Sequence, residues 1–492
     1  MSTLSTFIKF LRQAVALLLL PWLAWSCQMV TGDYDDEIEA SSTPNYINVT
    51  ISVTASNNPV TRAPQGGEYG DGTEKGIDRE NKINDITLIF YQDDAGINTP
   101  SDDAEVVCVE RFAVRPFGAN DLPNNHTHKT GEPATAQGQE VLYTTGNQKL
   151  DNTQLVIGQT YKVLVVANAD MAITAGAKIK DVREQVLNSV FTGTGIGVDA
   201  TNFVMASETD ATVTLTNPTP DTSDGQNKMI YYFECIHIER LAARIDYHTV
   251  GSEYSTDYNG YKYDNSTGSG FFVVTKVTPF NLYNENEYYF KRVRSNWTDA
   301  TPTITYLGDE TTANYVIDPN TVNKASDTFS YLNPLTSLTS ALEGDYTRVM
   351  SAVQNEDPSS LTTIQSKDNV IIGYAKENTL CPNALLKNHA TGLAFEVKWY
   401  DNANSEPKTF VYYHYLRHQG EKETGSYQAK KLEEMANDNE IYNPSTTSPA
   451  MNYGIVRNNI YRVSIEGMSP DKVTLHIKVK KWDKFVHEPI YM

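Results

Sequence analysis

The sequence has 492 residues, 40% of them hydrophobic, and its 61 acidic residues outnumber its 40 basic ones to give a net charge of -21. A chain of this length folds into about two to three domains with adequate cores. A chain this negative binds nucleic acid and anionic lipid poorly, so both classes of partner are disfavoured.

The first 27 residues predict a lipoprotein signal peptide. Lys9 and Arg12 precede an apolar run over 14–25, and the small Ser26 stands directly before Cys27. This run is too short to cross a bilayer, which needs about 20 apolar residues. The pattern indicates export, a loose lipobox and acyl attachment at Cys27; an ordinary secretory signal with a chance cysteine is the alternative. An acidic stretch follows, and it suits a tether between an acylated end and a folded body.

The first predicted strand, 46–53, is followed closely by a predicted cleavage site. Four apolar side chains alternate along this strand and point to one face: Ile47, Val49, Ile51 and Val53. Arg62 and Ala63 come next, just before a glycine-rich loop, which is a typical place for proteolysis. Cutting after Arg62 would release the strand within a propeptide, 28–62, and leave an apolar groove that requires a substitute strand. Arg79 is the alternative cut.

The body of the chain consists of short alternating segments separated by turn residues, which is typical of β-sandwiches. The clearest strands are 86–91, 106–114, 161–167, 231–238, 271–277, 393–399 and 460–465. A helix is expected over 179–191, where apolar residues recur on one face, and weaker helices over 337–342 and 427–435. We therefore expect an all-β fold with a few short helices and two domains, 63–235 and 236–470.

The C-terminal segment, 471–492, predicts a second alternating strand. Its apolar series consists of Val473, Leu475, Ile477 and Val479, extended by Trp482 and Phe485. Such a strand could fill the groove that the removed first strand leaves. The alternative is that it is the last strand of its own domain.

No motif in the sequence predicts an enzyme or a cofactor. There is no Gly-rich phosphate loop, no nucleophile elbow and no metalloprotease motif. His126 and His128 share one strand face but have no third ligand in view, so we expect no metal site. Cys108, Cys235 and Cys381 are odd in number and widely spaced, which does not suit a disulfide framework. Cys108 and Cys235 stand in strand-like runs, so we expect their side chains to be buried.

Several segments resemble the FimA/Mfa-type fimbrillins of Bacteroidales, the subunits of type V pili, and within them the shaft subunit of the short fimbria. The segments that carry the resemblance are 443–449, 456–461, the Glu-Arg-x-x-Ala-Arg stretch 239–244, the tryptophan-containing tail 482–487, Arg62-Ala63 and 161–167. They are spread over nearly the whole chain, with no comparable match between 285 and 380.

The resemblance implies two transthyretin-like β-sandwich domains in tandem and a palmitate-bearing lipoprotein precursor anchored in the outer membrane. It further implies that an arginine-specific protease removes the first strand, and that copies then join head to tail by donor-strand exchange in a cell-surface fimbrium that supports adhesion. Anchor and tip fimbrial subunits are the other expected partners. The alternative functions are a monomeric surface lipoprotein and a tip adhesin, either of which would bind a host glycan or protein.

Overall fold

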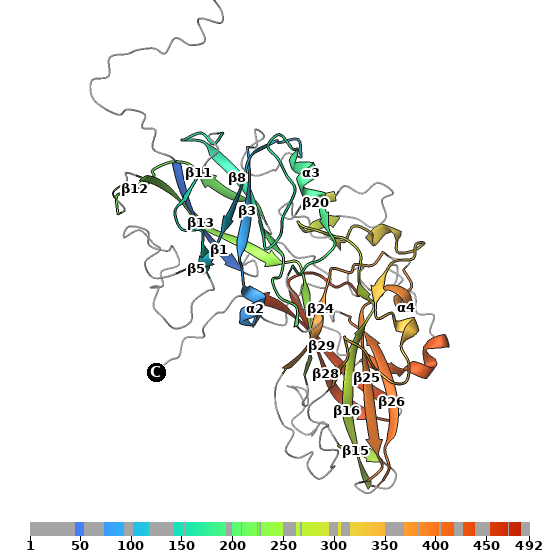
Figure 1. The fold of residues 1–492 in the computed structure, drawn as a ribbon. Helices are drawn as coiled ribbons and strands as arrows, with labels where there is room; N and C mark the ends of the chain where they lie inside the picture. Colours follow the sequence, from blue (N-terminus) through green and yellow to red (C-terminus); the bar gives the residue numbers. More distant parts are fainter. Residues whose placement is uncertain are drawn as a thin grey trace, which may run out of the picture. The chain divides into compact units, whose positions relative to one another are not determined.

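The structure is a computed structural model that describes residues 45–53, 73–92, 102–117, 142–150, 154–192, 199–207, 209–223, 225, 228–248, 262–265, 268–294, 304–306, 315–349, 369–381, 384–402, 405–417, 427–437, 453–470 and 472–483. The chain divides into two units, Met1–Thr43 and Pro44–Met492, and all described residues belong to the second. Strands dominate these residues and form two large sheets, which confirms the all-β prediction (Figure 1).

The first sheet contains eleven of the described strands. Eight of them pair in the order β4-β3-β8-β10-β13-β1-β6-β5, while β11 pairs with β8, β12 with β13 and β7 with β1. Their bounds are β1 (Asn45–Val53), β3 (Asp85–Tyr91), β4 (Val106–Ala113), β5 (Arg115–Pro116), β6 (Leu142–Thr144), β7 (Gln148–Lys149), β8 (Thr160–Ala167), β10 (Met205–Ser207), β11 (Ala211–Thr214), β12 (Thr219–Asp221) and β13 (Lys228–Arg240).

The second sheet also contains eleven of the described strands. Nine pair in the order β15-β16-β25-β26-β27-β29-β28-β14-β24, while β2 pairs with β29 and β23 with β16. Their bounds are β2 (Thr73–Lys75), β14 (Ala243–His248), β15 (Lys262–Asn265), β16 (Gly268–Phe280), β23 (Arg348–Val349), β24 (Asn369–Ala375), β25 (Gly392–Tyr400), β26 (Lys408–Tyr415), β27 (Tyr427–Lys431), β28 (Asn459–Ser469) and β29 (Lys472–Asp483).

Small elements lie outside these two sheets. The short strand pairs are β17 (Leu282–Tyr283) with β22 (Tyr331–Leu332) and β18 (Glu287–Tyr288) with β9 (Val186–Leu187), beside a three-stranded sheet of β19 (Arg292–Arg294), β20 (Ile304–Tyr306) and β21 (Tyr315–Ile317). The helical turns are α2 (Asp78–Asn81), α3 (Ile179–Arg183), α4 (Leu386–His389), η2 (Thr321–Asn323), η3 (Leu335–Ser337) and η6 (Leu432–Asn437). None of the helices in the described ranges is long and apolar enough to span a membrane.

The seven clearest predicted strands are all present, but the helix predictions are wrong in extent. The helix expected over 179–191 ends at Arg183, because Val186 pairs with Tyr288 as part of β9 instead of continuing the helical face. The segment expected as a helix over 427–435 begins as β27, which pairs with β26 and β29, and only then forms η6. Of the helix expected over 337–342, only the first residue is helical, as the end of η3. In the first two cases strand pairing with distant residues overrides local helical preference.

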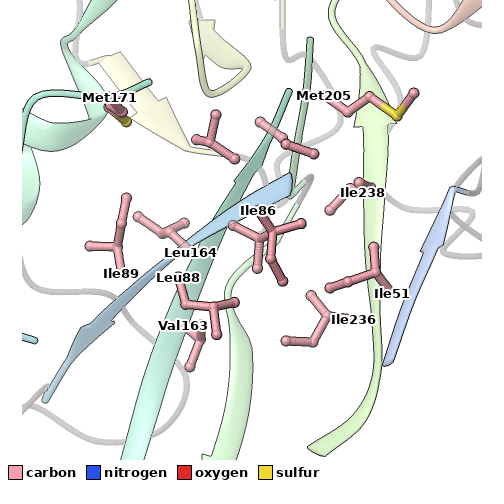
Figure 2. Close-up of a cluster of buried hydrophobic side chains, with 14 of the residues drawn as sticks. Ile51, Ile86, Leu88, Ile89, Val163, Leu164, Met171, Met205, Ile236 and Ile238 are labelled. Carbon is pink, nitrogen blue, oxygen red and sulfur yellow. The ribbon is translucent and has the colours of Figure 1, made fainter. Parts of the chain in front are cut away.

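The change from the first sheet to the second falls between Arg240 and Ala243. Strand β13 therefore runs straight through the predicted domain boundary at 235–236 and ends five residues later, at Arg240. The two sheets bury largely separate hydrophobic clusters, one built mostly from β1, β3, β8 and β13 and the other from β14, β16, β25, β28 and β29. The larger cluster of the first sheet is drawn in part in Figure 2.

The three cysteines of the described residues are free thiols. Cys108 and Cys381 are buried and Cys235 is half-buried. Burial raises the pKa of the Cys108 thiol to about 12, with a smaller contribution from the Glu110 carboxylate. Burial likewise raises the pKa of Cys235 to about 12. Both thiols are therefore protonated and unreactive at neutral pH.

Candidate strand-exchange site

Strand β1 lies inside the first sheet and uses both of its edges. On one side it pairs in parallel with β13, from Asn45 opposite Met229 to Val53 opposite Ile238. On the other side it pairs antiparallel with β6 and β7. Figure 1 shows β1 alongside β13. Loss of β1 would therefore expose unpaired backbone groups on two flanking edges at once.

The four apolar side chains of β1 are buried in the core as the alternation predicts. Ile47, Val49 and Ile51 are 0% exposed and Val53 is 1% exposed. Figure 2 shows Ile51 facing the core beside Ile236 and Ile238 of β13. The space that these four side chains occupy is an apolar slot within the first sheet, which suits a strand with apolar side chains on one face.

The opposite face of β1 is also buried, which the sequence did not indicate. Asn48 is 4% exposed; its amide donates to Asn147 Oδ1 (3.0 Å), and its Oδ1 accepts from Thr144 Oγ1 (2.8 Å). The backbone N–H of Val49 donates to Thr145 Oγ1 (3.0 Å). The slot therefore selects a polar side chain at one position of the strand as well as apolar side chains at the others.

A register shift in the middle of β1 adds to this selectivity. Val49 lies opposite Phe233, whereas Ile51 lies opposite Ile236, so β13 has one more residue than β1 across this step. Such a β-bulge locally breaks the ladder and re-aims the strand. A replacement strand must match this irregular register.

The predicted lipidation and cleavage residues, Cys27, Arg62 and Ala63, lie outside the described residues. The alternative cut, Arg79, lies within α2 and is followed directly by Glu80 and Asn81, which are 0% and 2% exposed. The side chain of Arg79 donates to the Tyr374 hydroxyl (3.4 Å). The peptide bond after Arg79 thus links it to Glu80, which is buried.

Glu80 is the centre of a buried charge network that holds α2. Its Oε2 accepts from the backbone N–H of Ile77 (2.8 Å) and from Arg244 Nη1 (3.1 Å), and its Oε1 accepts from the Tyr374 hydroxyl. Burial, and next the Glu80 carboxylate, raise the pKa of Tyr374, so the hydroxyl keeps its proton and donates it. Opening α2 would separate Glu80 from Arg244 and Tyr374 and break up a buried charge network, which is costly.

Two segments that carry the fimbrillin resemblance, 239–244 and 456–461, meet at the same network. Arg240 donates from Nη1 to Asn458 Oδ1 (3.0 Å) and from Nε to the Glu80 carbonyl (2.9 Å). Asn458 adopts φ +56°, a left-handed conformation that asparagine tolerates better than most residues. These motif residues are buried, so their role is to hold the fold together.

Arg457 forms a second buried charge cluster in the same segment. Its Nη2 lies 2.8 Å from Glu377 Oε2 and 3.1 Å from Glu287 Oε1, and its guanidinium also donates to the carbonyls of Tyr288 and Tyr289. Burial raises the pKa of Glu287, although Arg457 partly opposes the shift. Sequence reasoning missed this cluster because its members lie far apart along the chain.

The C-terminal strand β29 lies inside the second sheet, between β27 and β28. It pairs with β28 from Lys472 to Lys481 and, in parallel, with β2 near its end. Its alternating side chains are 0–1% exposed within the second core: Val473, Leu475, Ile477 and Val479. The side chain of Trp482, and Phe485 altogether, lie outside the described residues. Donation of these residues to another copy stays a prediction.

The fold of this chain is similar to that of several fimbrial and cell adhesion proteins. A cell adhesion candidate from Parabacteroides distasonis is 12% identical with a TM-score of 0.41, over 90% of this chain and 98% of that one. A fimbrilin (FimA) from Porphyromonas gingivalis is 12% identical with a TM-score of 0.38, over 91% and 99%. The C-terminally truncated tip fimbrial protein Mfa3 of the same organism is 9% identical with a TM-score of 0.35, over 89% and 99%.

No protein-family model and no curated protein matches the sequence. Two of these three structures are fimbrial proteins, the class of protein that the sequence motifs resemble. Identities of 9–14% to four of the matching structures describe a distant likeness, which by itself establishes no function.

Proposed function

We propose that this chain is the shaft subunit of a cell-surface fimbria: exported as a lipoprotein through Cys27, cut after Arg62 and polymerised head to tail by strand exchange. The observation that carries the proposal is the interior position of β1, the N-terminal strand of the described chain. Every other strand of the first sheet comes after Arg62 in sequence. One cut between β1 and β2 therefore separates a central strand from the rest of its sheet.

The energetics of β1 explain why the cut chain would bind a substitute strand. Burial of its four aliphatic side chains contributes about 6 to 12 kcal/mol, at roughly 1.5 to 3 kcal/mol each. Whole domains are stable by only about 5 to 15 kcal/mol. Losing β1 thus removes stabilisation as large as the net stability of the domain, and a replacement strand would restore it.

The environment of Arg79 favours Arg62 as the cleavage site. A protease must bind several residues on each side of the cut bond in an extended form, and protein chains are nicked where such opening costs little. Cutting after Arg79 requires α2 to open and Glu80 to leave Arg244 and Tyr374, a buried charge network whose disruption is costly.

The donor segment is the C-terminal stretch 471–492, but its described part, β29, already belongs to the second sheet. Strand β29 already buries four aliphatic side chains in the second sheet, so moving it into a neighbour would lose about as much burial as it gained. We therefore assign the inserted part to the chain beyond Asp483, where Val486, Ile490 and Met492 share one face of an extended strand. A head-to-tail contact of this kind does not close on itself and produces a filament.

The test is to treat the purified chain, starting after Cys27, with a limiting arginine-specific protease, then to read the new N-terminus and run the unboiled product on a denaturing gel. We expect Ala63 as the new N-terminus and a ladder of stable oligomers, neither of which forms with Arg62→Ala. A cut that leaves Ala63 as the N-terminus but yields only monomers would instead favour a monomeric surface lipoprotein.

Two further samples locate the donor. A chain ending at Asp483 keeps β29, so it should fold and be cut but give no ladder alone, and it should shorten the ladder when mixed with the full chain. A synthetic peptide of residues 45–53 should occupy the empty slot and block the ladder, whereas the same peptide with Ile47 and Ile51 changed to Asp should not. A normal ladder from the chain ending at Asp483 would refute the assignment of the donor to the residues beyond it.

A further inference from the structure

A buried lysine lies against an asparagine amide and a carboxylate in the part of the chain between β21 and β25. Lys324 follows η2 and donates from Nζ to Asp318 Oδ2 (2.6 Å), to Asn378 Oδ1 (2.8 Å) and to the Thr379 carbonyl (2.9 Å). Asp318 follows β21, and Asn378 lies after β24. The cluster thus brings a nucleophile, an amide carbon and an acid–base group together.

The cluster is sealed from solvent. Asp318 is 2% exposed, Lys324 is 1% exposed and Asn378 is 0% exposed. The Lys324 Nζ also lies 4.2 Å from the centre of the Tyr283 ring. Burial lowers the pKa of Lys324, although the Asp318 carboxylate partly opposes this. A low-dielectric site favours the neutral amine over the ammonium ion, and a neutral amine is nucleophilic.

The asparagine amide is held in one orientation. Its Nδ2 donates to the His389 carbonyl (2.7 Å) and to Thr391 Oγ1 (2.9 Å), so its oxygen side faces Lys324. The carboxylate of Asp318 is fixed too, since it accepts from the backbone N–H groups of Thr379 (2.9 Å) and Asn320 (2.9 Å). Fixed groups at contact distance react far faster than the same groups in solution.

We propose that Lys324 and Asn378 form an intramolecular amide bond, with Asp318 as the proton carrier. The Lys324 Nζ attacks the Asn378 side-chain carbonyl carbon, and Asp318 takes a proton from Nζ. The tetrahedral intermediate collapses when the Asn378 C–N bond breaks, and Asp318 gives the proton to the departing nitrogen. The products are one secondary amide and one ammonia, so the step needs neither an oxidant nor a second reactant.

The bond would tie together two parts of the chain that are 54 residues apart in sequence. It would fasten the segment containing η2 to the segment between β24 and β25, both of which lie beside the second sheet. This cross-link is independent of strand exchange, because none of its residues belongs to β1 or β29.

The test uses the full chain, unfolded after purification and digested with trypsin, with mass spectrometry of the peptides. We expect the peptide containing Lys324 to be joined to the peptide containing Asn378, with a total mass lower by one ammonia and no tryptic cleavage at Lys324. Separate, unmodified peptides from the wild-type chain after prolonged incubation would overturn the proposal and leave a buried ion pair in its place.

Three variants separate the roles. Lys324→Met removes the nucleophile and should abolish the joined peptide, and Asp318→Asn removes the proton carrier and should reduce the joined fraction at least tenfold. Lys291→Met is the matched control, because Lys291 is also buried and paired, with Glu239 at 3.0 Å; its joined fraction should equal that of wild type. An undiminished joined fraction in Asp318→Asn would overturn the role of Asp318, and the wild-type digest decides on the bond even if a variant fails to fold.

Discussion

Replacing Ile51 with alanine measures how strongly the first sheet depends on β1. The side chain is 0% exposed and faces Ile236 and Ile238 (Figure 2). The substitution deletes three carbons, a transfer loss of about 2.4 kcal/mol at about 0.8 kcal/mol per buried CH₂. The cavity left behind adds to this loss, and measured costs of Ile→Ala in cores run from about 2 to 5 kcal/mol. We expect about 3 to 4 kcal/mol, because strands flank β1 on both sides and limit collapse into the cavity.

Hydrogen exchange with mass spectrometry is the suitable assay, because it reports each sheet of the uncut chain separately. Amides of β13 should exchange faster by the factor that corresponds to this loss, about a hundredfold or more. Amides of β16 in the second sheet serve as an internal reference and should not change. The control is Ile157→Ala, whose side chain is 58% exposed and should alter stability by less than about 0.5 kcal/mol. If β13 exchanged at the wild-type rate in Ile51→Ala, β1 would not be a core strand in solution, and the reasoning about the slot would fail.

Three further perturbations test other parts of the fold. Gly392→Ala should lower the free energy of unfolding by at least about 1 to 3 kcal/mol, because a Cβ there would lie 2.4 Å from the carbonyl oxygen of His414. The second sheet should therefore unfold at a lower urea concentration. Gly373→Ala, where the nearest atom is 4.0 Å away, is the control, and equal urea midpoints for the two variants would contradict the predicted strain. Arg457→Met should cost about 3 to 5 kcal/mol by leaving two carboxylates buried without their cation, measured by the same urea titration; a cost under 1 kcal/mol would show that the cluster adds little. Burial lowers the pKa of His414 to about 4, so between pH 4 and 6.5 the unfolded chain binds a proton that the folded chain does not. Through His414 alone, stability should therefore fall by up to about 3 kcal/mol as the pH drops from 6.5 to 4, and His389, whose pKa burial also lowers to about 4, adds a similar slope. His414→Leu should therefore reduce the slope by about half, and an unchanged slope would assign it to other groups.

Side-chain alternation was sufficient to predict the two strands on which the proposed function depends. Ile47 and Val49 in β1, and Val473 and Leu475 in β29, are buried as their period of two requires. The same pattern could not predict that β29 lies between β27 and β28, because sheet order depends on partners far away in sequence. Alternation fixes which side chains share a face, but not which strands are neighbours.

The parts of the site that escaped prediction are polar and buried. Glu80 stands in a short charged stretch that looks solvent-exposed in sequence, yet it bonds to Arg244, which is 164 residues away. Asn48 has the alternation of an outward-facing residue, yet it bonds to Thr144 in β6. No local sequence pattern predicts such pairs, because a polar residue in a strand is expected to face solvent unless its partner is known.

The parallel pairing of β1 with β13 also has a consequence for the order in which the chain folds. Asn45 emerges early in synthesis, but its partner Met229 and the rest of β13 follow only after all the other strands of the first sheet. Contacts between such distant residues form slowly, because a long loop must close before any stabilisation is gained. The first sheet therefore stays incomplete until Arg240, close to the middle of the chain, has been synthesised, and β1 lacks its parallel partner over that whole interval.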